Sequence, residues 1–369
     1  MSWKRLLAPV LCVGTMVCLA VPAPAFVNPK VILGGLLYRD KSLSSPPGQA
    51  CMDCHHPSAG WVDPANTQDP YNRVVSEGVL GNVFGGRNAP SAAYASFSPA
   101  FGWDNDVGGY VGGLFWDGRA TGTVTGTPLG DQAMGPFLNP VEMNNTEAGV
   151  VAAVQNAPYA WLFEVVYPDT DWTDVAGTYV GIAVAIGAFE ESWLLNKFTS
   201  KYDRVLAGKV RLTRLEQQGL DLFNGKANCS LCHPSAVVGG NPPLFTDFTY
   251  DNLGIPKSSN PLLAANPVDY GLGGRLDIAA ADPDGLELGK FKVPTLRNIA
   301  KTAPYGHNGY FATLTDIVDF YNTRDAPGAL WDAPEVPDNV NVTELGNLGL
   351  TRAEVQAIVA FLETLSDGI

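Results

Sequence analysis

The hydrophobic pattern of the chain predicts helices much more clearly than strands. One helix begins at the capping box Thr213-x-x-Glu216 and runs to Asn224, and another begins at Thr351-x-x-Glu354. The apolar face of this closing helix consists of Val355, Ile358, Val359, Leu362 and Leu365. A third, long helix is predicted over about residues 177–196. Because alternating strand patterns are scarce and the chain has 40 Gly and 28 Pro, we predict a mainly α fold with long loops.

The first 25 residues have the pattern of a secretory signal peptide. Lys4 and Arg5 precede an apolar run over residues 6–21, and Ala23-Pro24-Ala25 is a small-x-small cleavage site before Phe26. An uncleaved membrane anchor is the alternative, but the run is short for a span. No later stretch is apolar enough to cross a membrane. We therefore expect a cleaved signal peptide and a mature protein in the periplasm that does not span the membrane.

The mature chain is long enough for two domains and strongly acidic. Residues 26–369 number 344, and the polar stretch over residues 196–209 is the natural boundary between domains of residues 26–200 and 201–369. Loss of Lys4 and Arg5, with no acidic residue in the first 25, changes the net charge from −14 to −16. This charge argues against a nucleic-acid partner and favours a basic or neutral protein, or a small substrate.

Two Cys-x-x-Cys-His motifs carry the chemistry of the chain. They are Cys51-Met-Asp-Cys54-His55 and Cys229-Ser-Leu-Cys232-His233, and they use every cysteine left after the signal peptide. Two thiols one turn apart add to the vinyl groups of a porphyrin, and the adjacent histidine binds its iron. Two zinc half-sites or two disulfides are the alternatives. The motifs predict two covalent c-type haems, and their separation of 178 positions suggests a duplicated cytochrome c unit.

Further motifs surround the haem motifs and carry a family resemblance. In chain order they are Arg87-Asn88-Ala-Pro90, Phe115-Trp116-Asp117-Gly118-Arg119, Gly135-Pro136-x4-Val141-Glu142-Met143, Val293-Pro-Thr-Leu-Arg297-Asn298 and Thr302-Ala-Pro304-Tyr-Gly-His307-Asn-Gly309. With them the chain resembles the bacterial dihaem cytochrome c peroxidase superfamily, and within it the MauG-like branch. The resemblance covers nearly the whole mature chain and weakens over residues 92–114 and 120–131, where insertions are expected. It implies two cytochrome c-like domains, each with one haem, facing a shared interface.

The histidine inventory predicts an open first haem. The chain has four histidines, at positions 55, 56, 233 and 307, and His56 is too close to His55 to reach the other face of the same haem. In ordinary members of the superfamily a further histidine, in the loop after the first motif, caps the peroxidatic haem. Residues 57–87 contain no histidine, so this haem should react with peroxide without reductive activation. Met52 and Met134 remain alternative caps.

The second haem is predicted to have a tyrosine ligand. The second half of the chain contains no methionine, so His/Met ligation cannot arise within it. By resemblance, Tyr321 holds the position of the distal ligand, although a core tyrosine is the alternative because it lies one turn beyond Ile317. His307 is the competing ligand, but the resemblance makes it a hydrogen-bonding residue near this haem. An anionic phenolate favours higher iron oxidation states than a thioether does.

The resemblance assigns the remaining site residues. Glu142 matches the catalytic glutamate that moves a proton during O–O cleavage, and Gln132 and Pro136 match residues of the same pocket. Trp116 matches the aromatic residue between the two haems, with ordinary core packing as its alternative. A calcium ion between the haems is implied as well. Its ligands would be the side chain of Asn88 and the carbonyl groups of Thr302 and Pro304.

Two enzyme classes follow from these features. The first uses hydrogen peroxide to form a high-valent, bis-Fe(IV)-like dihaem state, then oxidises a residue, tryptophan in particular, of a periplasmic partner protein. The second is a conventional peroxidase that takes electrons from a small cytochrome or cupredoxin. A simple electron carrier has no need of Glu142 above an uncapped iron. MauG-like proteins also serve copper-related systems, so a copper-related partner is one option. Ala227 stands where one member of this branch has an exit tryptophan, so the resemblance implies that oxidising equivalents must leave through another aromatic residue here.

Overall fold

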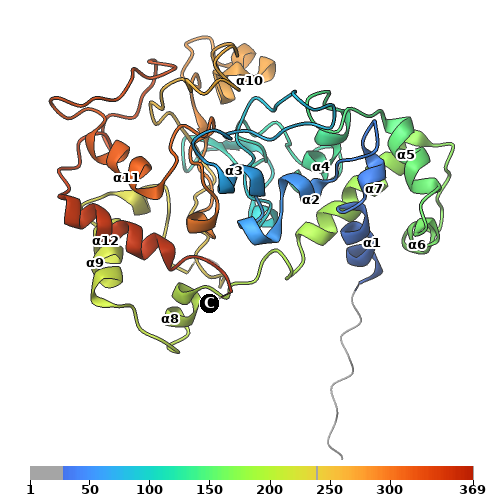
Figure 1. Cartoon of the computed structure of the whole chain (residues 1–369), viewed down its shortest axis with the longest axis horizontal. Helices are drawn as coiled ribbons and strands as arrows, with labels where there is room; N and C mark the ends of the chain where they lie inside the picture. Colours follow the sequence, from blue (N-terminus) through green and yellow to red (C-terminus); the bar gives the residue numbers. More distant parts are fainter. Residues whose placement is uncertain (1–27, 238–239, 369) are drawn as a thin grey trace, which may run out of the picture.

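The computed structural model describes residues 28–237 and 240–368, and it is mainly helical with two small sheets (Figure 1). The predicted mainly α class is therefore confirmed, whereas the predicted signal peptide lies outside the described residues. Within those residues no helix combines the length and apolarity needed to cross a membrane.

The helices and strands divide between two halves of the chain. The helices of the N-terminal half are α1 (Pro29–Leu37), α2 (Cys51–Cys54), α3 (Pro64–Gln68), α4 (Pro128–Leu138), α5 (Glu147–Gln155), α6 (Ala160–Val166) and α7 (Val175–Glu190). Those of the C-terminal half are α8 (Lys201–Leu206), α9 (Arg214–Asn224), α10 (Leu276–Ala281), α11 (Leu314–Thr323) and α12 (Arg352–Glu363). The strands form two antiparallel pairs, β1 (Gly102–Asp104) with β2 (Gly109–Val111) and β3 (Tyr250–Asp251) with β4 (Phe291–Lys292). The first pair falls within the region where insertions are expected.

Two of the three predicted helices begin where their capping boxes indicate. Thr213 caps α9 and Thr351 caps α12, each with a glutamate three residues later. The third, α7, ends at Glu190 rather than at residue 196. The side-chain amide of Asn196 donates hydrogen bonds to the carbonyl groups of residues 190, 191 and 192, and these bonds turn the chain out of the helix. The polar stretch that follows contains α8.

The chain forms two main hydrophobic cores. One is built from residues between Leu33 and Leu195, and the other from residues between Tyr202 and Leu365. In Figure 1 α1, α5, α6 and α7 lie at one end of the long axis, and α9, α11 and α12 lie at the other. Smaller apolar clusters, such as that of Val74, Val75 and Leu263, join residues from both halves.

The two cores repeat one helix crossing. A Cβ atom on Gly34 of α1 would collide with the carbonyl oxygen of Ala185 in α7, so these helices touch through their backbones. A Cβ atom on Gly219 of α9 would collide in the same way with the carbonyl oxygen of Ala357 in α12. At each crossing only glycine allows this approach, which stacks α1 on α7 in the first core and α9 on α12 in the second.

Aromatic rings complete the repeat. Each glycine is followed, four residues later, by an aromatic residue, Tyr38 in the first core and Phe223 in the second. Each of these rings contacts a phenylalanine that lies four residues after the alanine of the crossing. The ring centroids of Tyr38 and Phe189 are 5.1 Å apart, and those of Phe223 and Phe361 are 5.2 Å apart. A third ring touches both members of each pair, Trp61 in the first core and Phe245 in the second.

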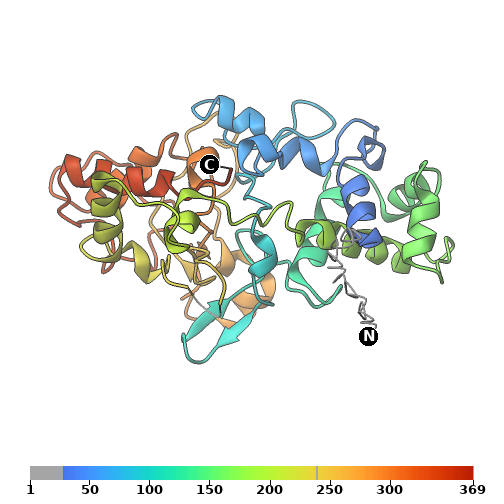
Figure 2. The ribbon, with the colours of Figure 1, turned by 90° about the horizontal axis from the view of Figure 1, so that it is seen from below.

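Contacts between the halves fix one against the other. The Arg87 guanidinium donates two hydrogen bonds to Asp269, at 2.6 and 2.7 Å, and a third to Asp117 at 2.7 Å. The Tyr250 hydroxyl donates to the carbonyl of Gly112. Figure 2 shows the hairpin of β1 and β2 projecting beneath the C-terminal half. Residues of the N-terminal half therefore form one wall of the space between the cores.

Candidate haem cavity

A cavity of about 1010 Å³ is lined by both halves of the chain. Its volume exceeds the usual range for a single small-molecule pocket. Every residue predicted for the haems, for peroxide chemistry and for calcium lies on its wall. These residues are Cys51, Cys54, His55, Asn88, Trp116, Gln132, Pro136, Glu142, Cys229, Cys232, His233, Thr302, Pro304, His307 and Tyr321.

The first motif forms the short helix α2. Nδ1 of His55 donates to the carbonyl oxygen of Trp61 at 3.2 Å, which leaves the lone pair on Nε2. Burial lowers the pKa of His55 and so favours the neutral imidazole that binds a metal. Asp53 caps the helix by accepting a hydrogen bond from the backbone N–H of Ala50. The motif thus presents two thiols and one oriented imidazole to the cavity.

The second motif begins with a 3₁₀ turn over Cys229–Leu231. Nδ1 of His233 donates to the carbonyl oxygen of Phe245 at 2.8 Å, and burial lowers the pKa of this histidine too. Phe245 and Trp61 both have positive φ, at 54° and 67°. Each is also the third ring on the helix crossing of its core. The repeated crossing therefore holds the carbonyl group that orients each proximal histidine.

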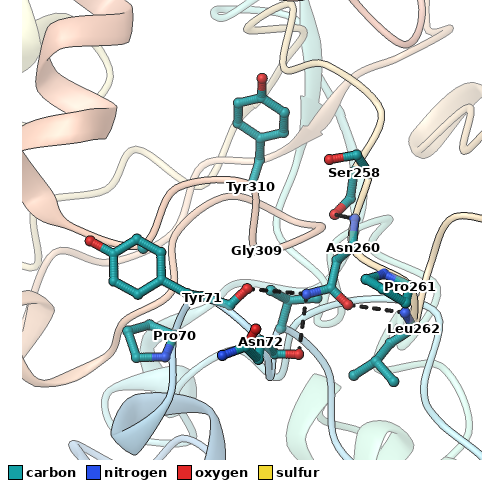
Figure 3. Close-up of a pocket in the computed structure, with 12 residues that line it drawn as sticks. Pro70, Tyr71, Asn72, Ser258, Asn260, Pro261, Leu262, Gly309 and Tyr310 are labelled. Carbon is teal, nitrogen blue, oxygen red and sulfur yellow. Dashed lines mark hydrogen bonds between the residues drawn. The ribbon is translucent and has the colours of Figure 1, made fainter.

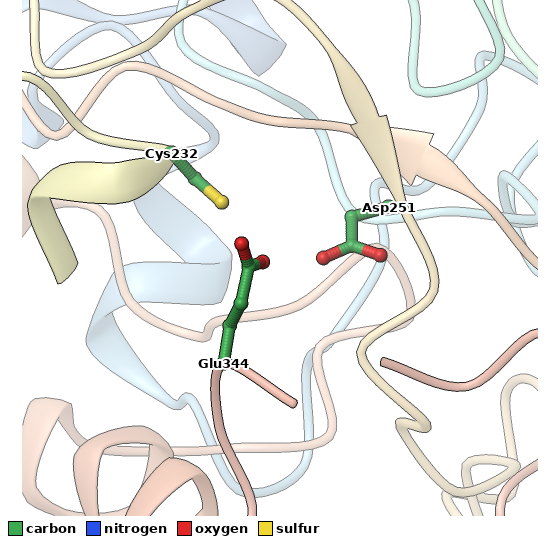
Figure 4. Close-up of side chains that lie close together, drawn as sticks. All are labelled: Cys232, Asp251 and Glu344. Carbon is green, nitrogen blue, oxygen red and sulfur yellow. The ribbon is translucent and has the colours of Figure 1, made fainter. Parts of the chain in front are cut away.

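The cysteines form neither of the alternative structures. All four are free thiols, so no disulfide exists within residues 28–237 and 240–368. Across the same residues, the one group of three metal-binding side chains close enough to share an ion is Cys232, Asp251 and Glu344 (Figure 4). It contains a single cysteine. Asn341 donates to both carboxylates, at 2.7 and 2.6 Å, which accounts for their proximity without a metal.

Glu142 lies in the loop after α4, and the α4 residues Gln132 and Pro136 line the cavity with it. The Asn139 amide donates to Oε1 of Glu142 at 2.9 Å and orients the carboxylate. Burial raises the pKa of Glu142, although the charge of Arg119 and the Asn139 hydrogen bond oppose the shift. A carboxyl that releases its proton nearer to neutral pH is suited to acid–base catalysis. Asn139 was not identified from the sequence, although its position three residues before Glu142 is a local signal.

The side chains named as alternative caps lie elsewhere. Met52 and Met134 pack against the N-terminal core and do not line the cavity. His56 hydrogen-bonds through Nδ1 to the Ser58 hydroxyl at 2.7 Å and does not line the cavity either.

Trp116 links the two halves beside the cavity. Its indole N–H donates to the carbonyl oxygen of Asn88 at 2.8 Å, and its own carbonyl accepts from the backbone N–H of Lys292 at 2.8 Å. The indole is thus fixed in one orientation on the cavity wall.

Tyr321 lies on α11, on the cavity wall near the second motif. Burial raises its pKa, and the nearby sulfur atoms of Cys229 and Cys232 raise it further. Without a cation beside it, the side chain is therefore a neutral phenol. His307 is 3% exposed and stacks on Phe291, with centroids 3.6 Å apart. Its Nε2 is 3.9 Å from Glu335, too far for a hydrogen bond.

The three residues predicted for calcium lie close to other predicted site residues. The Asn88 amide nitrogen donates to the carbonyl of Val74 at 3.0 Å, which leaves its side-chain oxygen free of that bond. The backbone N–H of Asn88 donates to the carbonyl of His307. Thr302 and Pro304 precede His307 in the same segment, so this arrangement offers oxygen donors of the kind that calcium prefers.

Unpaired polar atoms on the wall fit a bound cofactor. Within the described residues, six buried side-chain atoms lack a partner, and four of them belong to cavity residues, namely Gln49 Oε1, Ser76 Oγ and both ring nitrogens of His307. Burial lowers the pKa of Lys292, also on the wall, to about 7. An anionic group such as a haem propionate would pair with this amine. The donor set, the thiols and the cavity therefore fit two covalent haems.

A helical fold with two haem-attachment motifs on one cavity, lined by both halves of the chain, defines a dihaem c-type protein, and comparisons identify the family. The family model for di-haem cytochrome c peroxidase matches residues 28–211. Methylamine utilization protein MauG of Paracoccus denitrificans is 38% identical over 353 residues, which cover 91% of this chain and 88% of that protein. The chain therefore belongs to the di-haem cytochrome c peroxidase family.

Solved structures agree with this assignment and with the MauG-like branch. The diheme peroxidase BthA from Burkholderia thailandensis superposes with a TM-score of 0.81 at 30% identity, over 92% of this chain and 89% of that one. A MauG-like protein associated with microbial copper homeostasis superposes with a TM-score of 0.69 at 31% identity, over 92% and 90% of the two chains.

Proposed function

We propose that this chain is a periplasmic dihaem enzyme that reacts with hydrogen peroxide at the haem of the first motif. It shares the two oxidising equivalents with the haem of the second motif and oxidises a residue, tryptophan in particular, of a partner protein. The observation that carries the proposal is the convergence of Glu142, Trp116 and Tyr321 on the one cavity that both motifs face.

The chain holds the haems through paired thiols and one imidazole at each motif. When bound, the haems supply the redox chemistry, for which side chains alone are insufficient. His55 and His233 would hold the irons through Nε2, because their Nδ1 atoms donate to backbone carbonyls. We further propose cytochrome c-like domains of residues 26–200 and 201–369, following a cleaved signal peptide of residues 1–25. The repeated helix crossing supports this division.

Glu142 is proposed to be the acid–base catalyst. Cleavage of peroxide requires a proton to move from one oxygen to the other. The Glu142 carboxylate, held by Asn139, takes up this proton and returns it to the departing oxygen. Gln132 and Pro136 confine the space beside it. No histidine of the described residues between 57 and 87 competes for the open side of this haem.

Trp116 and Tyr321 are proposed to couple the haems and to ligate the second iron. The fixed indole of Trp116 lies on the wall between the halves and can carry charge from one side to the other. Tyr321 would supply a phenolate to the second haem, with His307 as a nearby hydrogen-bonding group. Asn88, Thr302 and Pro304 are proposed to bind one calcium ion, which would brace the interface between the two halves.

The alternative is a conventional peroxidase that takes electrons from a small cytochrome or cupredoxin. The similarity to the diheme peroxidase BthA favours this alternative. The two functions differ in the fate of the oxidising equivalents, because a peroxidase passes them to a soluble donor whereas the proposed enzyme retains them for a partner residue. A copper-related partner is one option for the proposed enzyme.

One experiment separates the two functions. Hydrogen peroxide is added to the diferric protein, and Mössbauer spectra report whether one iron or both carry the oxidising equivalents. Candidate periplasmic proteins are then added and analysed by mass spectrometry. Oxidation shared by both irons, followed by oxygen on a partner tryptophan, supports the proposal. Oxidation confined to the first haem, with fast cytochrome c turnover and an unmodified partner, supports the conventional peroxidase.

A further inference from the structure

We infer that oxidising equivalents leave the second haem through an aromatic path from Tyr321 to Trp331 and Tyr310. The path ends beside an uncharged surface pocket that receives an aromatic side chain of the partner protein. This inference rests on the proposed function and names the exit and docking site that the proposed function lacks. The inference also agrees with the presence of Ala227 at the position of the exit tryptophan noted above, since an alanine side chain cannot carry an oxidising equivalent.

Phe320 is the centre of the path. It is fully buried, and its ring centroid lies 6.2 Å from Tyr321, 5.3 Å from Trp331 and 4.9 Å from Phe311. Phe311 lies 6.0 Å from Trp331 and 5.0 Å from Tyr310. These rings are in continuous contact from the cavity wall to the surface. Because a benzene ring is harder to oxidise than an indole or a phenol, the phenylalanines act as bridges and Trp331 and Tyr310 act as stopping points.

Trp331 brings the path to the surface. Its indole is partly buried and donates through Nε1 to the Thr323 hydroxyl at 3.0 Å. A hydroxyl is a weak base, so an oxidised Trp331 retains its proton and passes the charge onward. The adjacent Leu330 is 98% exposed, which leaves an apolar side chain in solvent beside the exit. Such a residue is suited to contact with a protein partner.

Tyr310 can release its proton as it is oxidised. Its hydroxyl donates to Oδ2 of Asp332 at 3.2 Å. Tyr310 gives one electron to the path and its phenolic proton to Asp332. An aromatic side chain of the partner then gives one electron to Tyr310, and the proton returns from Asp332. Two such transfers use the two oxidising equivalents that one hydrogen peroxide molecule supplies.

A pocket of about 540 Å³ lies beside Tyr310 (Figure 3). Its walls come from residues 70–72, 74, 258–262, 309, 310 and 312, and none of these side chains is charged. In a chain with a net charge of −14, an uncharged pocket selects a neutral group. The Asn260 amide donates to the carbonyls of Tyr71 and Asn72, which joins two walls. Tyr71 is 71% exposed and offers its ring to an aromatic occupant.

The holoenzyme tests the path with a set of variants and a neutral probe. Trp331→Phe and Tyr310→Phe remove the stopping points, and Asp332→Asn removes the proton acceptor. Trp193→Phe is the control, because Trp193 is 71% exposed and outside the path. After peroxide is added without a partner, freeze-quench electron paramagnetic resonance records radicals and peptide mass spectrometry locates oxygen added to the chain. The probe is N-acetyltryptophanamide, whose oxidation is followed by stopped-flow.

In wild type we expect a tyrosyl signal and oxygen addition at Trp331. The Tyr310→Phe variant loses the signal, and Trp331→Phe and Asp332→Asn slow probe oxidation by about tenfold or more. In each variant the rate of the initial reaction with peroxide stays at the wild-type value, as it does in Trp193→Phe. Ser259→Trp fills the pocket from an exposed position and should raise KM for the probe more than it lowers kcat.

Two results distinguish the possible failures. If the double variant of Trp331→Phe and Tyr310→Phe, with unchanged haem absorption, oxidises the probe at the wild-type rate, the path is wrong. If wild type itself forms no oxidised state with peroxide, the proposed function is wrong, irrespective of the path.

Discussion

Replacing Glu190 by glutamine is expected to stabilise the folded protein at neutral and alkaline pH. Glu190 is the last residue of α7, is 4% exposed and lines the haem cavity near Tyr38 and Cys51. In the described part of the chain no hydrogen bond or ion pair reaches its carboxylate. Burial alone therefore raises the pKa of Glu190 to about 8.

The direction of the pH effect follows from this shift. In the unfolded chain Glu190 ionises near its ordinary pKa of about 4.5, whereas in the folded chain it keeps its proton up to about pH 8. The stability associated with the raised pKa is fully present below pH 4.5 and is lost as the pH rises to 8. The loss amounts to roughly 3 kcal/mol at pH 7 and roughly 5 kcal/mol above pH 8. Glutamine has no proton to lose, so the variant avoids this loss.

Guanidinium unfolding of the holoprotein measures the effect. The haems are attached covalently and stay on the unfolded chain, so the two states compare the same molecule. The free energy of unfolding of Glu190→Gln should exceed that of wild type by an amount that grows between pH 4.5 and pH 8.5. Glu191→Gln is the matched control, because Glu191 is the next residue along the chain and its side chain is exposed. A difference that does not change with pH would refute the reasoning.

Three further predictions concern the irons, the catalyst and the C-terminal core. The as-isolated ferric protein should show one high-spin and one low-spin haem by electron paramagnetic resonance. Two low-spin centres in wild type would contradict the open first haem. Tyr321→His should keep the second haem low-spin. Glu142→Gln should keep both haem spectra but slow the reaction with peroxide about 100-fold or more in stopped-flow, and it should abolish the loss of rate at low pH that a raised Glu142 pKa predicts. Unchanged kinetics would move the role to Gln132. Arg297→Met should lower the free energy of unfolding by about 3–5 kcal/mol, because it leaves Asp203 without its buried bidentate partner, and calorimetry showing no change would exclude a stabilising ion pair.

Local sequence determined the features that depend on neighbouring residues. The two Cys-x-x-Cys-His motifs define haem attachment within five residues each, and the capping boxes at Thr213 and Thr351 begin α9 and α12 where predicted. These signals are short-range, so no partner from elsewhere in the chain alters them. The missing histidine in residues 57–87 and the missing methionine in the second half are also facts of the sequence.

Tertiary contacts decided what the local pattern could not. The end of α7 depends on the Asn196 side chain returning to its last carbonyls, and the orientation of each proximal histidine depends on Trp61 or Phe245. The ring contacts of Phe320 with Tyr321 and Trp331 join residues close in sequence, but they depend on how the chain turns back after α11. The burial of Glu190 arises only when distant segments pack around the cavity. The physical reason is that such contacts depend on how the backbone turns and on where other segments lie, and the pattern of hydrophobic and polar residues specifies neither.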